Sequence, residues 1–183
     1  MNTGNVARGA VLGLVGGLLA AGAMSLVHRL LDDLIPKSRT PATEQPDDST
    51  VKVASAVTSL VGHRLTDDQK ARAGSAVHYV FGASVGAVYG AVAEIVPRVT
   101  AALGLPFGIA VWLGAHVIAV PALGLAEPPT RRPVAKEGEE FALHLVYGAA
   151  TEVARRLLRC SLAEAPSRSS QKMSTSPPPV NSG

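Results

Sequence analysis

Long apolar stretches alternate with polar segments along the chain. Four stretches are nearly free of charge, and a membrane's hydrocarbon core of about 30 Å takes about 20 helical residues to cross. They lie at about residues 8–31, 74–96, 101–126 and 141–158. None has the alternation of barrel strands, and backbone groups inside lipid must be paired within a helix or a closed barrel. The pattern therefore predicts an all-α membrane protein with four transmembrane helices.

The segments between and after these stretches are polar. A short amphipathic helix is expected at about 51–65, where apolar residues recur at helical spacing between polar ones. Thr66 and Gln69 have the spacing of a capping box, which predicts that the second long helix begins there. The chain ends in a stretch rich in Ser and Pro, so residues 161–183 are expected to form a disordered tail. The helical transmembrane domain is thus expected to cover residues 1–160.

The composition fits a membrane-embedded chain. Hydrophobic residues make up 47% and charged residues 17% of the 183 positions, whereas a typical soluble domain has about 25% charged residues. The net charge of +3 is compatible with nucleic-acid binding, but many basic residues flank apolar stretches instead of sharing one face. The lipid bilayer is therefore the expected partner, and nucleic acid is not. The single cysteine, Cys160, excludes an intrachain disulfide.

The distribution of arginines predicts the orientation. Four spans place both termini on one side of the membrane, and a cluster of arginines lies at the end of the last span, at residues 155–159. Because Lys and Arg near the ends of spans favour the cytoplasm, both termini are expected to be cytoplasmic. A signal peptide cleaved near residues 21–23 is a second interpretation of the first stretch, although the apolar run continues to Leu31.

Glycines recur at every fourth position in two of the expected spans. They are Gly9, Gly13 and Gly17 in the first span and Gly82, Gly86 and Gly90 in the second. Such ridges let helices approach closely. We expect them to pack the bundle internally; a homo-oligomer or a membrane partner is the alternative for the same faces. Residues 82–86 also match the G-x-S-x-G pattern of serine hydrolases, but that motif needs a strand-to-helix turn, and here it lies within an expected helix.

Several ionisable or phenolic side chains fall at membrane depth. They are His78, His116, His144, Glu94, Glu152 and Tyr89. At a rise of about 1.5 Å per residue, the three histidines and His28 fall in the half of the bilayer near the long loop, and the two glutamates fall in the other half. Polar groups at this depth are costly and are functional candidates.

Two interpretations of the histidines stay open. They would either hydrogen-bond neighbouring helices or form a proton-linked cluster. Neither an H-x-x-x-H pair nor an intramembrane Cys or Asp supports a metal, so no metal and no cofactor is expected. Glu152 stands four residues before Arg156, a spacing that predicts an ion pair.

A series of short motifs follows in order between residues 74 and 159. It includes Ala93-Glu94-Ile95-Val96-Pro97, Pro106-Phe107-Gly108-Ile109, Pro121-Ala122-Leu123-Gly124-Leu125 and Glu152-Val153-x-Arg155-Arg156. This series resembles the YagU-like family of bacterial inner-membrane proteins. The resemblance implies a multispan inner-membrane protein with a domain of unknown function and a loose association with acid tolerance. It supplies no catalytic residues.

The sequence therefore favours a small inner-membrane protein without enzymatic activity that contributes to acid or envelope stress tolerance. One alternative is a proton- or ion-handling protein that uses the intramembrane histidines. The other is a membrane scaffold that binds a partner through the glycine ladders or the loop at 44–72. A cavity that joins the histidines would favour the first alternative, and a large exposed glycine face would favour the second.

Overall fold

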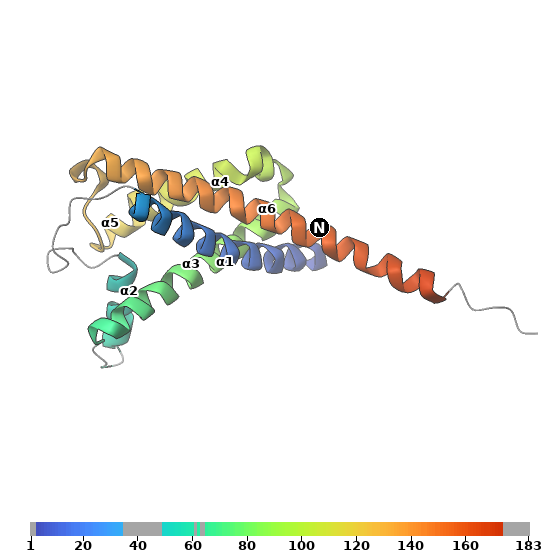
Figure 1. Cartoon of the computed structure of the whole chain (residues 1–183), viewed down its shortest axis with the longest axis horizontal. Coiled ribbons are helices and arrows are strands. Elements are labelled where there is room, and N and C mark those ends of the chain that lie inside the picture. Colours follow the sequence, from blue (N-terminus) through green and yellow to red (C-terminus); the bar gives the residue numbers. More distant parts are fainter. Residues whose placement is uncertain (1–2, 35–48, 61, 63–64, 174–183) are drawn as a thin grey trace, which may run out of the picture.

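The computed structural model describes residues 3–60, apart from 35–48, together with 62 and 65–173. Within this part of the chain the regular structure is entirely helical, as predicted. The α-helices are α1 (Thr3–Leu34), α2 (Ser49–Leu60), α3 (Asp67–Ile95), α4 (Leu105–Val111), α5 (Val120–Ala122) and α6 (Val134–Met173) (Figure 1). Two 3-10 segments, η2 (Pro97–Gly104) and η4 (Pro129–Arg131), and one π-helical segment, η3 (Trp112–Ala119), connect them.

Three of the described segments are long and apolar enough to cross a membrane. They are α1, α3 and the run from Pro97 to Ala122. Their outer surfaces carry large apolar side chains, such as Val11, Val88 and Ile118, each more than 60% exposed. The buried positions of α1 and α3 are mostly glycine and alanine. Small residues inside and large apolar residues outside are typical of helices that face lipid, so these segments indicate a membrane protein.

Helices α1 and α3 pack antiparallel through glycines. Gly9 lies against Gly90, Gly13 against Gly86, and Gly17 against Gly82. At each of these positions a Cβ atom would overlap the backbone of the opposite helix or come unusually close to it. The two backbones can approach this closely only because glycine has no side chain. The glycine ladder of α1 thus packs on the glycine ladder of α3 within one chain.

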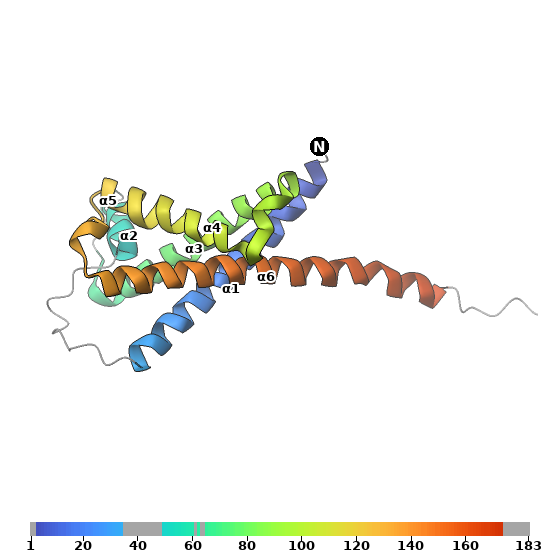
Figure 2. The same cartoon turned by 90° about the horizontal axis from the view of Figure 1, so that it is seen from above.

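Helix α6 packs against α1 and against the segment from η2 to α4. Gly16 of α1 lies on the backbone of α6 at Thr151, and Gly104 and Gly108 lie on the backbone of α6 around Gly148. In Figure 2, α1 crosses α6 obliquely, and the C-terminal part of α6 extends beyond the other helices. Helix α6 therefore connects α1 to the segment from η2 to α4.

The start of the second long helix is confirmed. Helix α3 begins directly after Thr66, whose backbone N–H donates to Oε1 of Gln69 at 2.9 Å. The short helix expected at 51–65 is α2, and it ends earlier, at Leu60. The chain turns there because Gly62 adopts a left-handed conformation with φ of 75°.

The first residues of the third apolar segment, which runs from Pro97 to Ala122, do not form an α-helix. Ala102 and Leu103 have left-handed φ angles of 47° and 54°, and Gly104 follows with φ of 79°. Helix α4 starts only at Leu105, with Pro106 in its first turn. Proline suits the first turn of a helix, and glycine takes a left-handed conformation at little cost. We call residues 102–104 the left-handed turn. Its residues are apolar or glycine, so the hydrophobic pattern did not distinguish it from the helix that follows.

Two helix ends also differ from expectation. The third apolar stretch leaves its helix at Ala122 instead of residue 126, because Gly124 turns the chain with φ of 69°. Helix α6 continues to Met173 and does not end at residue 158. Residues 159–165 are mostly good helix formers, so the helix takes in the first part of the segment expected to be disordered. The rest of that segment, 174–183, lies outside the described residues.

Candidate functional site

Polar side chains of α3 and α6 meet where η2 packs on α6. We call this group the charge cluster, and its members are Tyr89, Glu94, Glu152, Arg155, Arg156 and Arg159. Glu152 is at its centre, with a side chain that is 0% exposed. Nε and Nη2 of Arg155 donate to its two oxygens at 2.8 and 3.0 Å. Such bidentate pairing of a guanidinium with a carboxylate is a strong form of ionic hydrogen bond.

Two further donors complete the coordination of Glu152. The hydroxyl of Tyr89 donates to Oε2 at 2.9 Å, and Nε of Arg156 donates to Oε1 at 2.5 Å. The predicted Glu152–Arg156 ion pair is therefore confirmed, although it is one contact of several. A buried carboxylate with four donors keeps its charge compensated without water.

Glu94 brings a second carboxylate to the charge cluster. Its side chain is 8% exposed. It accepts from Nη1 and Nη2 of Arg159 at 2.5 and 3.0 Å, and it lies 3.7 Å from Nη1 of Arg155. Arg155 is thus shared between the two carboxylates and ties α3 to α6. Its Nη1 is buried and has no hydrogen-bond partner among the described residues.

The surroundings of the charge cluster come from the segment after α3. Phe107 of α4 stacks on the ring of Tyr89, with centroids 4.1 Å apart. Nη2 of Arg156 donates to the carbonyl of Thr100 at 3.0 Å. A Cβ atom at Gly104 would lie 2.9 Å from the Cβ of Glu152, so the left-handed turn packs on the base of this side chain. The strained backbone and the buried charges therefore occupy one place in the fold.

A second polar group lies nearer the beginning of α6. We call it the histidine cluster, and its members are His116, His144, Glu137 and Arg132. The rings of His116 and His144 have centroids 5.8 Å apart. Nε2 of His116 donates to Glu137 at 3.0 Å, and the two side chains are each 13% exposed. The π-helical segment η3 carries His116; such segments are frequent at functional sites.

His78 lies at the edge of the histidine cluster. Its Nε2 donates to the carbonyl of Ala21 at 3.3 Å. This contact between α1 and α3 lies one helical turn from the contact of Gly17 with Gly82. His144 donates from Nδ1 to the carbonyl of Glu140 at 2.7 Å, and it interacts electrostatically with both His116 and His78. The structure thus places the predicted histidines together at one end of the bundle.

The six candidate residues therefore divide into two groups. Glu94, Glu152 and Tyr89 belong to the charge cluster; His116 and His144 belong to the histidine cluster, and His78 lies at its edge. From Glu137 to Glu152, α6 rises about 22 Å. Sequence reasoning missed Glu137 and Arg132. An acidic residue in the first turn of a helix, as Glu137 is in α6, could have drawn attention, because it faces the positive end of the helix dipole.

Two other features bear on the chemistry. Ser84, in the hydrolase-like pattern, donates its hydroxyl to the carbonyl of Val80 at 2.7 Å within the continuous helix α3. It lacks the sharp turn that a nucleophile elbow needs. His28, Asp32 and Glu139 gather between α1 and α6 with ligand atoms close enough for one metal ion. The sequence did not predict this third group.

Comparison with known proteins gives one family. A family model described as "Protein of unknown function (DUF1440)" matches residues 26–153. The match begins near the end of α1, includes α2 to α5, and ends within α6 at residue 153, just before the arginines of the charge cluster. No curated protein and no solved structure matches the chain.

Proposed function

The chain belongs to the DUF1440 family of proteins of unknown function, and we propose that it is a small, non-enzymatic membrane protein that responds to acid. The observation that carries this proposal is the contact of His116 with His144 and Glu137. Histidine is the side chain whose charge ordinarily changes between pH 5 and 8. Acid on that side of the membrane would therefore add charge at one end of the bundle. The resemblance to the YagU-like family supports an inner-membrane location and a role in acid tolerance.

The proposal includes α6 as a fourth span. Its composition is less apolar than that of the other three because Glu152, Arg155 and Arg156 interrupt it. Glu152 and Arg155 are buried and paired with each other, so neither presents an uncompensated charge to lipid. Charged residues within spans are ordinarily paired in this way and face the bundle interior. Four spans would put both termini on one side.

The orientation can be tested at Cys160, which is exposed just after the arginines of the charge cluster. The positive-inside rule places it in the cytoplasm. We expect a membrane-impermeant maleimide to leave Cys160 unmodified in intact spheroplasts and to modify it after permeabilisation. A Cys160→Ser variant controls for labelling of other proteins. Modification before permeabilisation would contradict the orientation.

The acid response can be tested at His144. With both rings protonated, two positive charges 5.8 Å apart would repel each other by on the order of 3 kcal/mol at an effective dielectric constant of about 20. Glu137 and Glu140 offset part of this repulsion, whereas Arg132 and His78 add to it. Because unfolding separates these charges, stability should fall as the pH drops from 7.5 to 5.

We therefore expect His144→Gln to lose less thermal stability over this pH interval than the wild type does. The measurement is the unfolding temperature of purified protein in lipid nanodiscs with a chelator present. Ser84→Ala is the control, since Ser84 lies on α3 outside the histidine cluster and has no ionisable group, and it should keep the wild-type pH dependence. Equal losses in the wild type and His144→Gln would mean that the histidines only hold the helices together.

A second candidate function is proton handling, which one stripe of α6 favours. Tyr147 and Thr151 lie on this helix between the two clusters, and both are buried. The hydroxyl of Tyr147 donates to the carbonyl of Gly82 at 2.6 Å, and that of Thr151 donates to the carbonyl of Tyr147 at 2.8 Å. Two buried hydroxyls thus lie between the level of His144 and Glu152, each donating to a backbone carbonyl. Proton flux into liposomes that a folded Tyr147→Phe variant abolishes would identify this function. A scaffold function has less support, since the glycine ladders are filled within the chain.

A further inference from the structure

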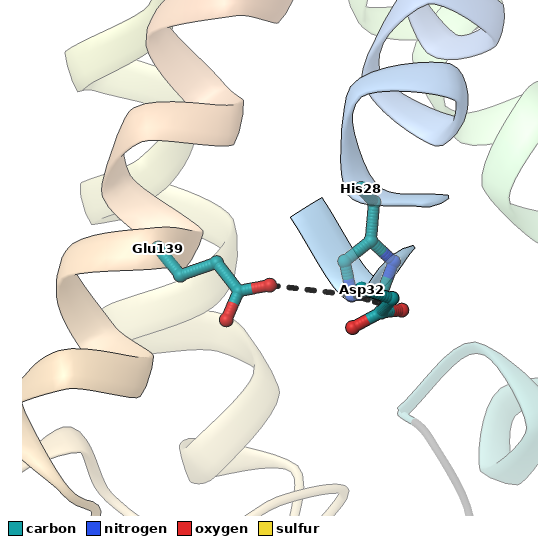
Figure 3. Close-up of side chains that lie close together, drawn as sticks. All are labelled: His28, Asp32 and Glu139. Carbon is teal, nitrogen blue, oxygen red and sulfur yellow. Dashed lines mark ion pairs between the residues drawn. The ribbon is translucent and has the colours of Figure 1, made fainter. Parts of the chain in front are cut away.

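Three potential metal ligands converge where α1 ends and α6 begins. His28 and Asp32 stand one helical turn apart in α1, so their side chains share a face. Glu139 of α6 points at the same ring nitrogen, as Figure 3 shows. Nε2 of His28 lies 3.7 Å from Oδ2 of Asp32 and 3.5 Å from Oε1 of Glu139. All three ligand atoms lie within 4.8 Å of one another.

These separations fit ligands of one ion better than hydrogen bonds. An N–H···O bond spans about 2.7–3.2 Å, and both separations exceed that range. Zinc binds imidazole nitrogen and carboxylate oxygen at about 2.0–2.2 Å, which puts tetrahedral ligands about 3.4 Å apart. An ion placed among the three atoms would therefore need only small shifts of side chains at the ends of helices.

The donor set also selects the class of ion. One imidazole nitrogen with two carboxylate oxygens suits divalent first-row transition ions such as Zn²⁺. Ca²⁺ and Mg²⁺ prefer oxygen donors throughout and gain little from a ring nitrogen. The side chains of His28 and Asp32 are 49% and 45% exposed, which leaves room for water in the remaining position.

Because the three residues lie on two different helices, a bound metal ion would link α1 to α6. Helices α1 and α6 already touch at Gly16 and Thr151. Twelve residues further along α1, and twelve residues back along α6, the antiparallel register brings His28 to Glu139. A shared ion there would fasten the two helices at a second point about 18 Å from the first.

We propose that His28, Asp32 and Glu139 form a binding site for a divalent transition-metal ion that joins the end of α1 to the start of α6. The ion takes the imidazole nitrogen of His28 and one oxygen from each carboxylate. The site is distinct from the histidine cluster and does not depend on the proposed acid response.

The test is titration of the full-length, tag-free protein in nanodiscs with Zn²⁺, against a chromogenic chelator at pH 7.5. We expect one equivalent of Zn²⁺ per chain and at least a tenfold loss of affinity in His28→Gln and in Glu139→Gln. Zn²⁺ should raise the unfolding temperature of the wild type by mass action, whereas Mg²⁺ should not. Co²⁺ should give the visible absorption of a tetrahedral nitrogen and oxygen site.

His116→Gln is the matched control, since it removes an imidazole that pairs with a neighbouring carboxylate of α6. We expect this variant to bind Zn²⁺ as the wild type does. Wild-type affinity in both Glu139→Gln and His28→Gln would overturn the proposal, and so would an equal loss in His116→Gln. Glu139→Gln keeps the size of its side chain, which is 20% exposed near the start of α6, so a folded variant is expected, and size-exclusion chromatography checks this.

Discussion

Replacing Glu152 with Gln should destabilise the bundle by about 3–5 kcal/mol, the typical cost of breaking a buried ion pair from one side. The substitution leaves Arg155, which is 6% exposed, with only the more distant carboxylate of Glu94 at 3.7 Å. It also leaves the Tyr89 hydroxyl without its ionised acceptor. The half-exposed Arg156 can turn to water and should add little to the loss. Reversible unfolding in mixed micelles measures the change.

The matched control is the double variant Glu152→Leu with Arg155→Leu. Replacement of a buried pair by apolar residues of similar volume is often neutral or stabilising. We therefore expect the double variant to be more stable than Glu152→Gln. A single variant as stable as the wild type would show that the pair contributes no stability. A double variant worse than the single one would assign a further role to the arginine.

A leucine at Gly86 should be similarly damaging. A Cβ atom at this position would lie 2.7 Å from the Cα of Gly17 and would overlap the carbonyl of Gly13. Both contacts are backbone, so α1 and α3 can relieve them only by moving apart. Overpacking costs about 1–3 kcal/mol, occasionally more, and we expect a loss of about 3 kcal/mol. The unfolding temperature in nanodiscs reports it.

Gly114 offers the matched control for this prediction. It lies in an apolar segment, is exposed, and would have no atom within 4 Å of an added Cβ. Gly114→Leu should therefore leave the unfolding temperature nearly unchanged. Equal losses at the two positions would mean that the contact between α1 and α3 does not decide the result, since leucine favours a helix more than glycine does.

Patterns with a local cause predicted much of the fold. Three of the apolar stretches correspond to helices that could cross a membrane, and the spacing of Thr66 and Gln69 located the start of α3. These features depend on residues a few positions apart. The left-handed turn escaped prediction because Ala102 and Leu103 are ordinary apolar residues, which seldom adopt a positive φ, so nothing in their local sequence marks the turn.

In the charge cluster and the histidine cluster, too, contacts between residues close in sequence could be predicted, and contacts between distant residues could not. The contact of Glu152 with Arg156 lies within one helical turn and was predicted. The contacts of Glu152 with Tyr89 and of His116 with Glu137 join distant parts of the chain. Such contacts depend on which helices are neighbours and on their relative positions along the bundle. A single sequence does not specify this pairing. The depth argument placed the histidines in one layer, but it could not say that Glu137 joins them.

The spacing of charges along α6 has a consequence for the surrounding lipid. Only residues 141–151 separate Glu140 from Glu152 without a charge, a rise of about 17 Å. The hydrocarbon layer of an average bilayer is about 30 Å thick. If α6 spans, lipid beside its outer face meets Arg156, which is 48% exposed, well before the layer ends. We expect the bilayer to thin there and headgroups to be drawn inward, at a cost of fractions of a kcal/mol per Å. Such a local dimple would make this protein prefer thin membranes to thick ones.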